Sequence, residues 1–262
     1  MTNRPQIVYS FIFIYSLIDY IVQLKNFAAF TVLIFGLHYL IEDDIKSIIK
    51  YVLCICLAST LHSGYIIYFL LILVRFMRKN KKFIIIYLFS LPVFSLLLPI
   101  LIDIIGRLVT TDAVVNLYLS NFTKMSTIIV LIVWQLVGCI LVFLYTSNYS
   151  LTFKSNFIKK YNLNKYESKV IELTILINIC MIIIFCFYPI DVVFQRISRN
   201  VLTLDSIAFS VMWKYAQKNE KYGQIAIWIL YLIVTACAFY PLKNIEWINI
   251  HRMALENNIF WK

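Results

Sequence analysis

Three polar residues interrupt a long apolar stretch near position 60. His62 follows Thr60 and precedes Ser63. Histidine exchanges a proton near neutral pH, so His62 could take a proton from a hydroxyl group or donate a hydrogen to an anion. The alternative is a histidine that bonds a neighbouring carbonyl group at a helix end. Both interpretations place His62 where a helix ends.

Two arginines stand three residues apart in the sequence DVVFQRISRN. On a helix this spacing puts Arg196 and Arg199 on one side, where two guanidinium groups could hold a phosphate or diphosphate. The alternative is an anchor among lipid headgroups, an ordinary role for arginine at a membrane interface. Lys25 and Arg107 are further candidates for binding the same anion.

The remaining ionisable residues and the cysteines form no metal or redox pattern. Four acidic residues in or near outer halves of apolar stretches could act as a base or pair with an arginine: Asp19, Asp103, Asp191 and Asp205. For His38 and Glu172 the sequence favours structural roles. Cys54 and Cys56 are two residues apart and would point away from each other on a helix. No aspartate-rich loop occurs, so we expect neither a metal nor a cofactor.

The elements that position these residues are predicted to be membrane helices. Hydrophobic residues make up 62% of the 262 positions and charged residues 14%, whereas soluble proteins are about half apolar and a quarter charged. A bilayer core about 30 Å thick needs roughly 20 apolar residues in a helix. We therefore predict an all-α, polytopic transmembrane helical bundle, with residues 1–262 as a single integral-membrane domain.

Apolar stretches suggest about eight or nine crossings, with one or more broken helices. The predicted spans are 7–24, 27–41, 45–61, 63–74, 83–105, 126–146, 170–190, 201–215 and 224–240. Residues 48–74 could instead form one long tilted helix. Gly64 and the polar residues beside it favour a break at His62.

The net charge of +11 comes largely from short basic segments between the apolar stretches. One segment contains Arg75, Arg78, Lys79, Lys81 and Lys82, and another contains Lys154, Lys159, Lys160, Lys165 and Lys169. The positive-inside rule places both segments in the cytoplasm. With a break at His62, the candidate histidine, lysine and arginines then share the outer face. Nucleic acid is not an expected partner, because no soluble domain carries these charges.

The sequence around His62 resembles the EpsG family of bacterial polysaccharide polymerases, which is related to the Wzy-type proteins. That family shows an Ala-Ser-x-x-His-x-Ser-type motif, and the segment ASTLHS at 58–63 is similar to it. Lys25-Asn26 stands where the family has Arg-Gln, and QRISRN around Arg196 resembles a later arginine segment. Family members are usually longer at the amino end, so the resemblance predicts either a shortened variant or further helices upstream.

This resemblance implies glycosyl transfer at the outer face of the bacterial cytoplasmic membrane. Undecaprenyl-diphosphate-linked oligosaccharide repeat units would be joined there into a capsular, exo- or O-antigen polysaccharide. Arg196 and Arg199 would hold the diphosphate leaving group, and His62 would be the base or would position the acceptor. Lys25, Arg107 and Ser63 would bind substrate.

The partners implied are the lipid-linked oligosaccharide, the lipid bilayer, and the flippase and chain-length regulator of the same pathway. Three other functions fit a chain with ionisable residues at membrane depth. These are a flippase or transporter of lipid-linked sugars, a membrane acyltransferase that modifies polysaccharide, and a non-catalytic assembly partner.

Overall fold

The computed structural model describes residues 6, 24–42, 44–109, 125–129, 131–133, 135–136, 165–190, 194, 197–198, 200–201, 204–208 and 210–211. Nearly all of these residues are helical and no strand occurs among them, which agrees with the predicted all-α class. The predicted span 224–240 lies wholly outside the described residues, and the span 7–24 lies outside them except for its last residue.

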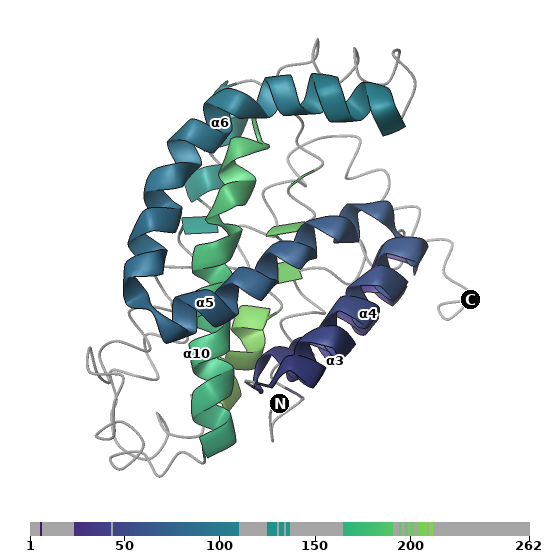
Figure 1. Cartoon of the computed structure of the whole chain (residues 1–262), viewed down its shortest axis with the longest axis vertical. Coiled ribbons are helices and arrows are strands. Elements are labelled where there is room, and N and C mark those ends of the chain that lie inside the picture. The colour runs from purple at the N-terminus through teal and green to yellow at the C-terminus, as the bar shows by residue number, and fades with distance from the viewer. Residues whose placement is uncertain are drawn as a thin grey trace, which may run out of the picture.

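The described chain begins with a helical hairpin and continues into a longer bundle (Figure 1). Its elements are α3 (Leu24–Leu40), α4 (Ile45–Leu61), the 3₁₀ helix η1 (Ser63–Ile72), α5 (Leu73–Lys79), α6 (Lys81–Val109), α10 (Lys165–Cys180) and the 3₁₀ helix η2 (Met181–Cys186). Helix α3 packs against α4, while α10 contacts η1, α5 and η2. Helix α6 contacts α5 and η2.

The predicted helix break at His62 is confirmed. Helix α4 ends at Leu61, and His62 adopts an extended backbone with φ −151° and ψ 111°. Its backbone N–H still donates to Ala58 O at 2.9 Å. Helix η1 begins at the next residue. The chain therefore turns back at His62 instead of continuing as one long helix.

Helix η1 buries one side chain in every three. Tyr65, Tyr68 and Leu71 are each no more than 2% exposed, and Val74 and Met77 continue the row into α5. A 3₁₀ helix has three residues per turn, so residues three apart lie above one another. The row faces the rest of the bundle and leaves the other sides of η1 freer.

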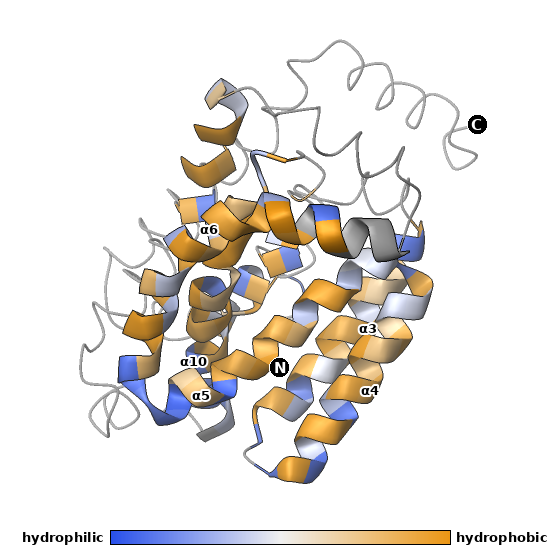
Figure 2. Ribbon diagram, turned by 45° about the horizontal axis from the view of Figure 1, so that its top comes forward, coloured by the Kyte–Doolittle hydropathy of each residue, from blue (hydrophilic) through white to orange (hydrophobic). Residues whose placement is uncertain are grey.

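Two helices in the described part of the chain are long and apolar enough to cross a membrane. They are Lys81–Leu101 and Tyr166–Cys186. The first exposes large apolar side chains along its length, such as Phe89 and Leu96, and the ribbon of α6 is correspondingly orange (Figure 2). Pro92 and Pro99 lie inside α6, which bends along its course as proline-containing helices do (Figure 1). The predicted total of eight or nine spans remains a prediction.

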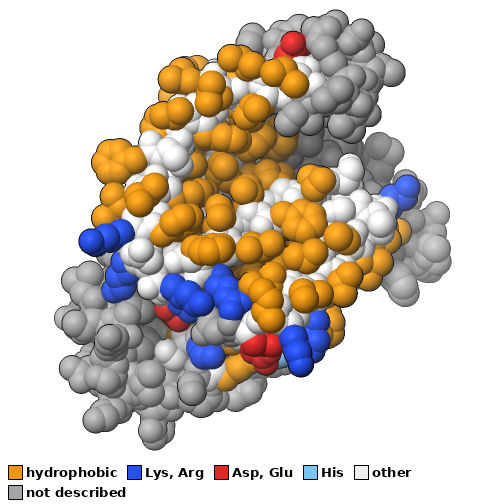
Figure 3. Space-filling model, viewed as in Figure 1, with side chains coloured by type: hydrophobic (Ala, Val, Ile, Leu, Met, Phe, Trp, Pro, Cys, Tyr) orange, Lys and Arg blue, Asp and Glu red, His pale blue; other side chains and the backbone are white. Residues whose placement is uncertain are grey.

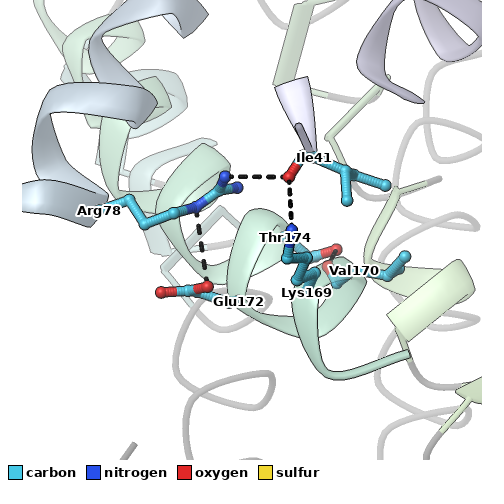
Figure 4. A network of polar contacts seen from close by, with 6 residues as sticks. All are labelled: Ile41, Arg78, Lys169, Val170, Glu172 and Thr174. Atoms are coloured by element: carbon cyan, nitrogen blue, oxygen red, sulfur yellow. Dashed lines mark hydrogen bonds and ion pairs between the residues drawn. The ribbon is translucent and has the colours of Figure 1, made fainter. Parts of the chain in front are cut away.

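Basic side chains gather along one edge of the molecule, below a broad apolar face (Figure 3). At this edge α3 and α5 end and α10 begins. Arg78 donates to the backbone oxygen of Ile41 at 3.3 Å, and Lys169 donates to the same oxygen at 3.4 Å. Arg78 Nε also lies 3.7 Å from Glu172 Oε2 (Figure 4). Arg78 of α5 and Lys169 of α10 therefore share the carbonyl group that follows α3. Glu172 pairs with Arg78 and so has a structural role, as its sequence position favours.

The α3–α4 hairpin is closely packed because a glycine faces the second helix. A Cβ atom added at Gly36 would lie 2.9 Å from Cys54 Cβ. Small residues allow helix backbones to approach closely in membrane proteins, where dispersion contacts drive association. The hairpin in turn fixes where Lys25 and His62 lie, because α3 begins and α4 ends beside them.

We predict that Gly36→Val lowers the free energy of unfolding by about 1–3 kcal/mol, because the branched side chain must push α4 away. The measurement is thermal unfolding of the purified protein in detergent. Phe35→Val is the control on the same helix, since Phe35 is 61% exposed and its change should cost less than about 1 kcal/mol. Equal unfolding midpoints for the two variants would contradict the close approach at Gly36.

Candidate functional site

Three separate segments meet at the end of the bundle opposite the basic edge. They are the start of α3, the start of η1, and a later segment of which residues 197, 198 and 200 are described. The side chain of Asn200 joins them: its Nδ2 donates to Tyr65 OH at 3.0 Å and to Tyr68 OH at 2.9 Å. Asn200 is 1% exposed, so these hydrogen bonds are sheltered from water and correspondingly important.

The hydroxyl group of each tyrosine also donates a hydrogen bond to a backbone oxygen. Tyr65 OH donates to Asn26 O at 2.9 Å, at the start of α3. Tyr68 OH donates to Ile197 O at 3.2 Å, in the same segment as Asn200. One asparagine side chain and two hydroxyl groups therefore hold α3, η1 and the described residues Ile197 and Asn200 in one arrangement.

A second buried contact holds the segment that contains Ser198 and Asn200 against the bundle. Tyr188 OH lies 2.9 Å from Ser198 Oγ and 2.8 Å from Gln135 Oε1. Gln135 Nε2 in turn donates to Met181 O at 3.1 Å. The segment is thus fastened on two sides by uncharged groups whose hydrogen bonds are met inside the protein, as buried polar groups require.

His62 lies at the edge of this assembly and is only partly buried. Its Nδ1 accepts a hydrogen bond from the backbone N–H of Gly64 at 3.2 Å. Its ring packs edge-on against Tyr65, with ring centroids 5.8 Å apart and an angle of 73°. Tyr65 therefore links the imidazole ring to the Asn200 side chain, and Ser63 beside it is exposed.

The structure places Lys25 at the same end as His62. Lys25 is exposed, and the next residue, Asn26, is the one whose carbonyl oxygen bonds Tyr65. Arg196 and Arg199 lie outside the described residues, although their chain neighbours Ile197, Ser198 and Asn200 are described. Arg107 lies near the end of α6, and its side chain is outside the description. The structure thus puts Lys25, His62 and Ser63 at one end of the bundle, where described chain neighbours of the two arginines also lie.

Of the acidic candidates, Asp205 lies in the core instead of at this exposed end. It is 2% exposed, and its Oδ1 accepts from Asn178 Nδ2 at 2.5 Å. Its Oδ2 has no hydrogen-bond partner among the residues that the structure describes. Asp19 and Asp191 lie outside the described residues. The sequence signal for Asp205 was its position in an apolar stretch, which does not distinguish a core residue from a site residue.

Tyr65, Tyr68, Asn26 and Asn200 were not predicted to belong to the site. Asn200 directly precedes the predicted span 201–215, where a polar residue is ordinary, so its position carried no clear signal. The two tyrosines did not stand out among the 18 tyrosines of the chain.

The described residues at this end offer a positive charge and a hydrogen-bonding ring. Lys25 supplies a positive charge, and His62 supplies an imidazole group. Within the described residues no cluster of three or more histidine, cysteine or acidic side chains could hold a metal ion. The chemistry available to these side chains is electrostatic stabilisation and proton or hydrogen-bond donation.

A family model described as the EpsG family matches residues 1–251 of the chain. No curated protein and no solved structure matches it. The matched range contains every residue named in the site.

We predict that Asn200→Ala lowers the free energy of unfolding by about 1–3 kcal/mol, because two buried tyrosine hydroxyl groups lose their donor. Thermal unfolding in detergent measures the effect. Thr31→Ala is the control: Thr31 is exposed and its hydroxyl group donates to the Phe27 carbonyl group of its own helix. A midpoint for Asn200→Ala as high as that of Thr31→Ala would show that the connection does not hold the three segments together.

Proposed function

Because the chain belongs to the EpsG family, a family of membrane proteins in polysaccharide biosynthesis, we propose that it polymerises a bacterial surface polysaccharide. Its substrates would be undecaprenyl-diphosphate-linked oligosaccharide repeat units. The protein would act as a multi-pass protein of the cytoplasmic membrane, with its site on the outer face. The product would be a capsular polysaccharide, an exopolysaccharide or an O-antigen.

The observation that carries this proposal is the placement of His62. The basic edge formed around Arg78 and Lys169 marks the cytoplasmic side under the positive-inside rule. Helix α4 runs from that edge to His62, so the histidine reaches the opposite side of the membrane. It is partly exposed, at the same end of the bundle as the exposed Lys25. A polymerase that receives exported lipid-linked units needs its reacting groups on that side.

The chemistry of the transfer matches the charges available. The bond between the anomeric carbon of the growing chain and its diphosphate breaks, and the diphosphate leaves on its lipid carrier. The same carbon bonds to a hydroxyl oxygen of the next repeat unit. Cationic groups stabilise the charge that develops on the leaving oxygen. We assign this task to Lys25, Arg196 and Arg199, with Arg107 and Ser63 as further substrate-binding residues.

Deletion of the gene followed by complementation with His62→Ala tests the proposal. We expect the variant to leave single repeat units that have been exported on lipid, with no long chains on a polysaccharide gel. His38→Ala is the matched control, because His38 is exposed, lies near the basic edge and contacts Tyr166 OH at 2.9 Å. It should support normal chain length.

Two outcomes of this experiment oppose the proposal. Long chains at normal yield with His62→Ala would show that the site assignment is wrong. Repeat units stranded in the cytoplasm would indicate a flippase, which moves the lipid-linked unit across the membrane. Export of intact units without elongation is the outcome that fits a polymerase.

We also predict that a cysteine at position 63 reacts with a membrane-impermeant maleimide added outside intact cells. Ser63 is exposed and follows the helix break directly. Lys79→Cys is the control at the other end of the η1–α5 segment, where Lys79 is also exposed, and it should react only after the cells are opened. Labelling of position 63 only from the cytoplasm would reverse the proposed orientation.

A further inference from the structure

The hydrogen bond between Gly64 and His62 fixes which ring nitrogen carries hydrogen. A backbone N–H can only donate, so Nδ1 of His62 is the acceptor in the 3.2 Å contact. A neutral imidazole ring has one nitrogen that donates and one that accepts. The neutral ring therefore carries its hydrogen on Nε2.

Packing around the ring maintains this arrangement. A Cβ atom at Gly64 would lie 3.1 Å from both Nδ1 and Cε1 of His62, so the glycine backbone lies close against that side of the ring. Tyr65 packs edge-on against the ring, and Tyr65 is itself held by Asn26 and Asn200. Within the described part of the chain, no hydrogen bond to Nε2 is present, and the side chain is partly exposed.

A general base needs the opposite distribution of hydrogen. To take a proton on Nε2, the neutral ring would first have to carry its hydrogen on Nδ1. That hydrogen would then face the N–H of Gly64, and two donors would oppose each other without an acceptor. The geometry at the helix break therefore supports hydrogen-bond donation by Nε2 and opposes proton abstraction by it.

We propose that His62 donates a hydrogen bond through Nε2 to the diphosphate oxygen that leaves the sugar. This inference rests on the proposed polymerase function. As the anomeric carbon–oxygen bond breaks, its electron pair stays on the diphosphate oxygen, and the Nε2–H group stabilises the growing charge. The acceptor hydroxyl oxygen bonds to the anomeric carbon, and its proton passes to the released diphosphate. The exposed Lys25 at the same end adds positive charge for the same anion.

Amide variants of His62 test this role in purified full-length protein in lipid nanodiscs, with lipid-linked repeat units as substrate. The side-chain nitrogen of glutamine reaches the position of Nε2 and donates, but it is not basic. We expect His62→Gln to keep kcat within about tenfold of the natural protein. His62→Ala and His62→Asn, which lack a donor at that position, should fall by about 10²-fold to 10³-fold.

The dependence of kcat/KM on pH separates the donor from a base. For a donor, His62→Gln and the natural protein should share one profile. For a base, the activity of the natural protein should fall on acidification, and this fall should be missing in the variants. Activity of His62→Gln as low as that of His62→Ala, at unchanged unfolding midpoints, would overturn the donor role.

Failure of this inference is distinguishable from failure of the proposed function. If His62→Ala polymerises at the natural rate, the site itself is wrongly assigned. If His62→Ala is inactive and His62→Gln is equally inactive and equally stable, the site stands and only the donor role is wrong. His38→Gln is the matched control and should leave kcat unchanged, because His38 lies away from the site near the basic edge.

Discussion

A helix that breaks in apolar surroundings must find partners for the backbone groups that it frees, and the site depends on how this chain does so at His62. Where water is excluded by apolar side chains or lipid, the protein itself has to supply these partners. The N–H of His62 bonds Ala58 O, and the N–H of Tyr65 bonds His62 O. The N–H of Gly64 bonds the imidazole ring. The His62 side chain thus accepts a hydrogen bond from one of the backbone groups freed at the break. This bond sets the orientation of its ring.

The same requirement explains why polar side chains meet behind the histidine. Each hydroxyl or amide group that is buried without a partner costs several kcal/mol in an apolar medium. Tyr65, Tyr68 and Asn200 satisfy one another and two backbone oxygens. A network with all of its groups bonded is rigid and specific, so it can hold segments that are more than 130 positions apart in the sequence. A rigid network fixes the positions of the segments that carry Lys25 and His62, the side chains of the proposed chemistry.

Local signals were enough to predict the helix break, whereas the contacts behind it required the fold. Gly64 and the polar residues around it are short-range features, and helix α4 ends within one residue of the break that they predict. Tyr65 and Tyr68 resembled the many other aromatic residues expected at bilayer interfaces. Their roles depend on Asn200, which no local pattern connects to them. For Asp205 the local signal was misleading. Its polarity suggested a site residue, but in the structure it is buried and bonds Asn178 in the core.

The 3₁₀ form of η1 also changes how far the chain reaches. A 3₁₀ helix rises about 2.0 Å per residue, compared with about 1.5 Å in an α-helix. The 10 residues of η1 and the 7 residues of α5 therefore extend about 30 Å together, which matches the hydrocarbon thickness of a typical bilayer. As a continuous α-helix, these 17 residues would be short for a membrane span. Because η1 is a 3₁₀ helix, they reach from His62 to the basic edge. The tighter winding thus lets only 17 residues join the sharp turn at one end of the bundle to the charged turn at the other.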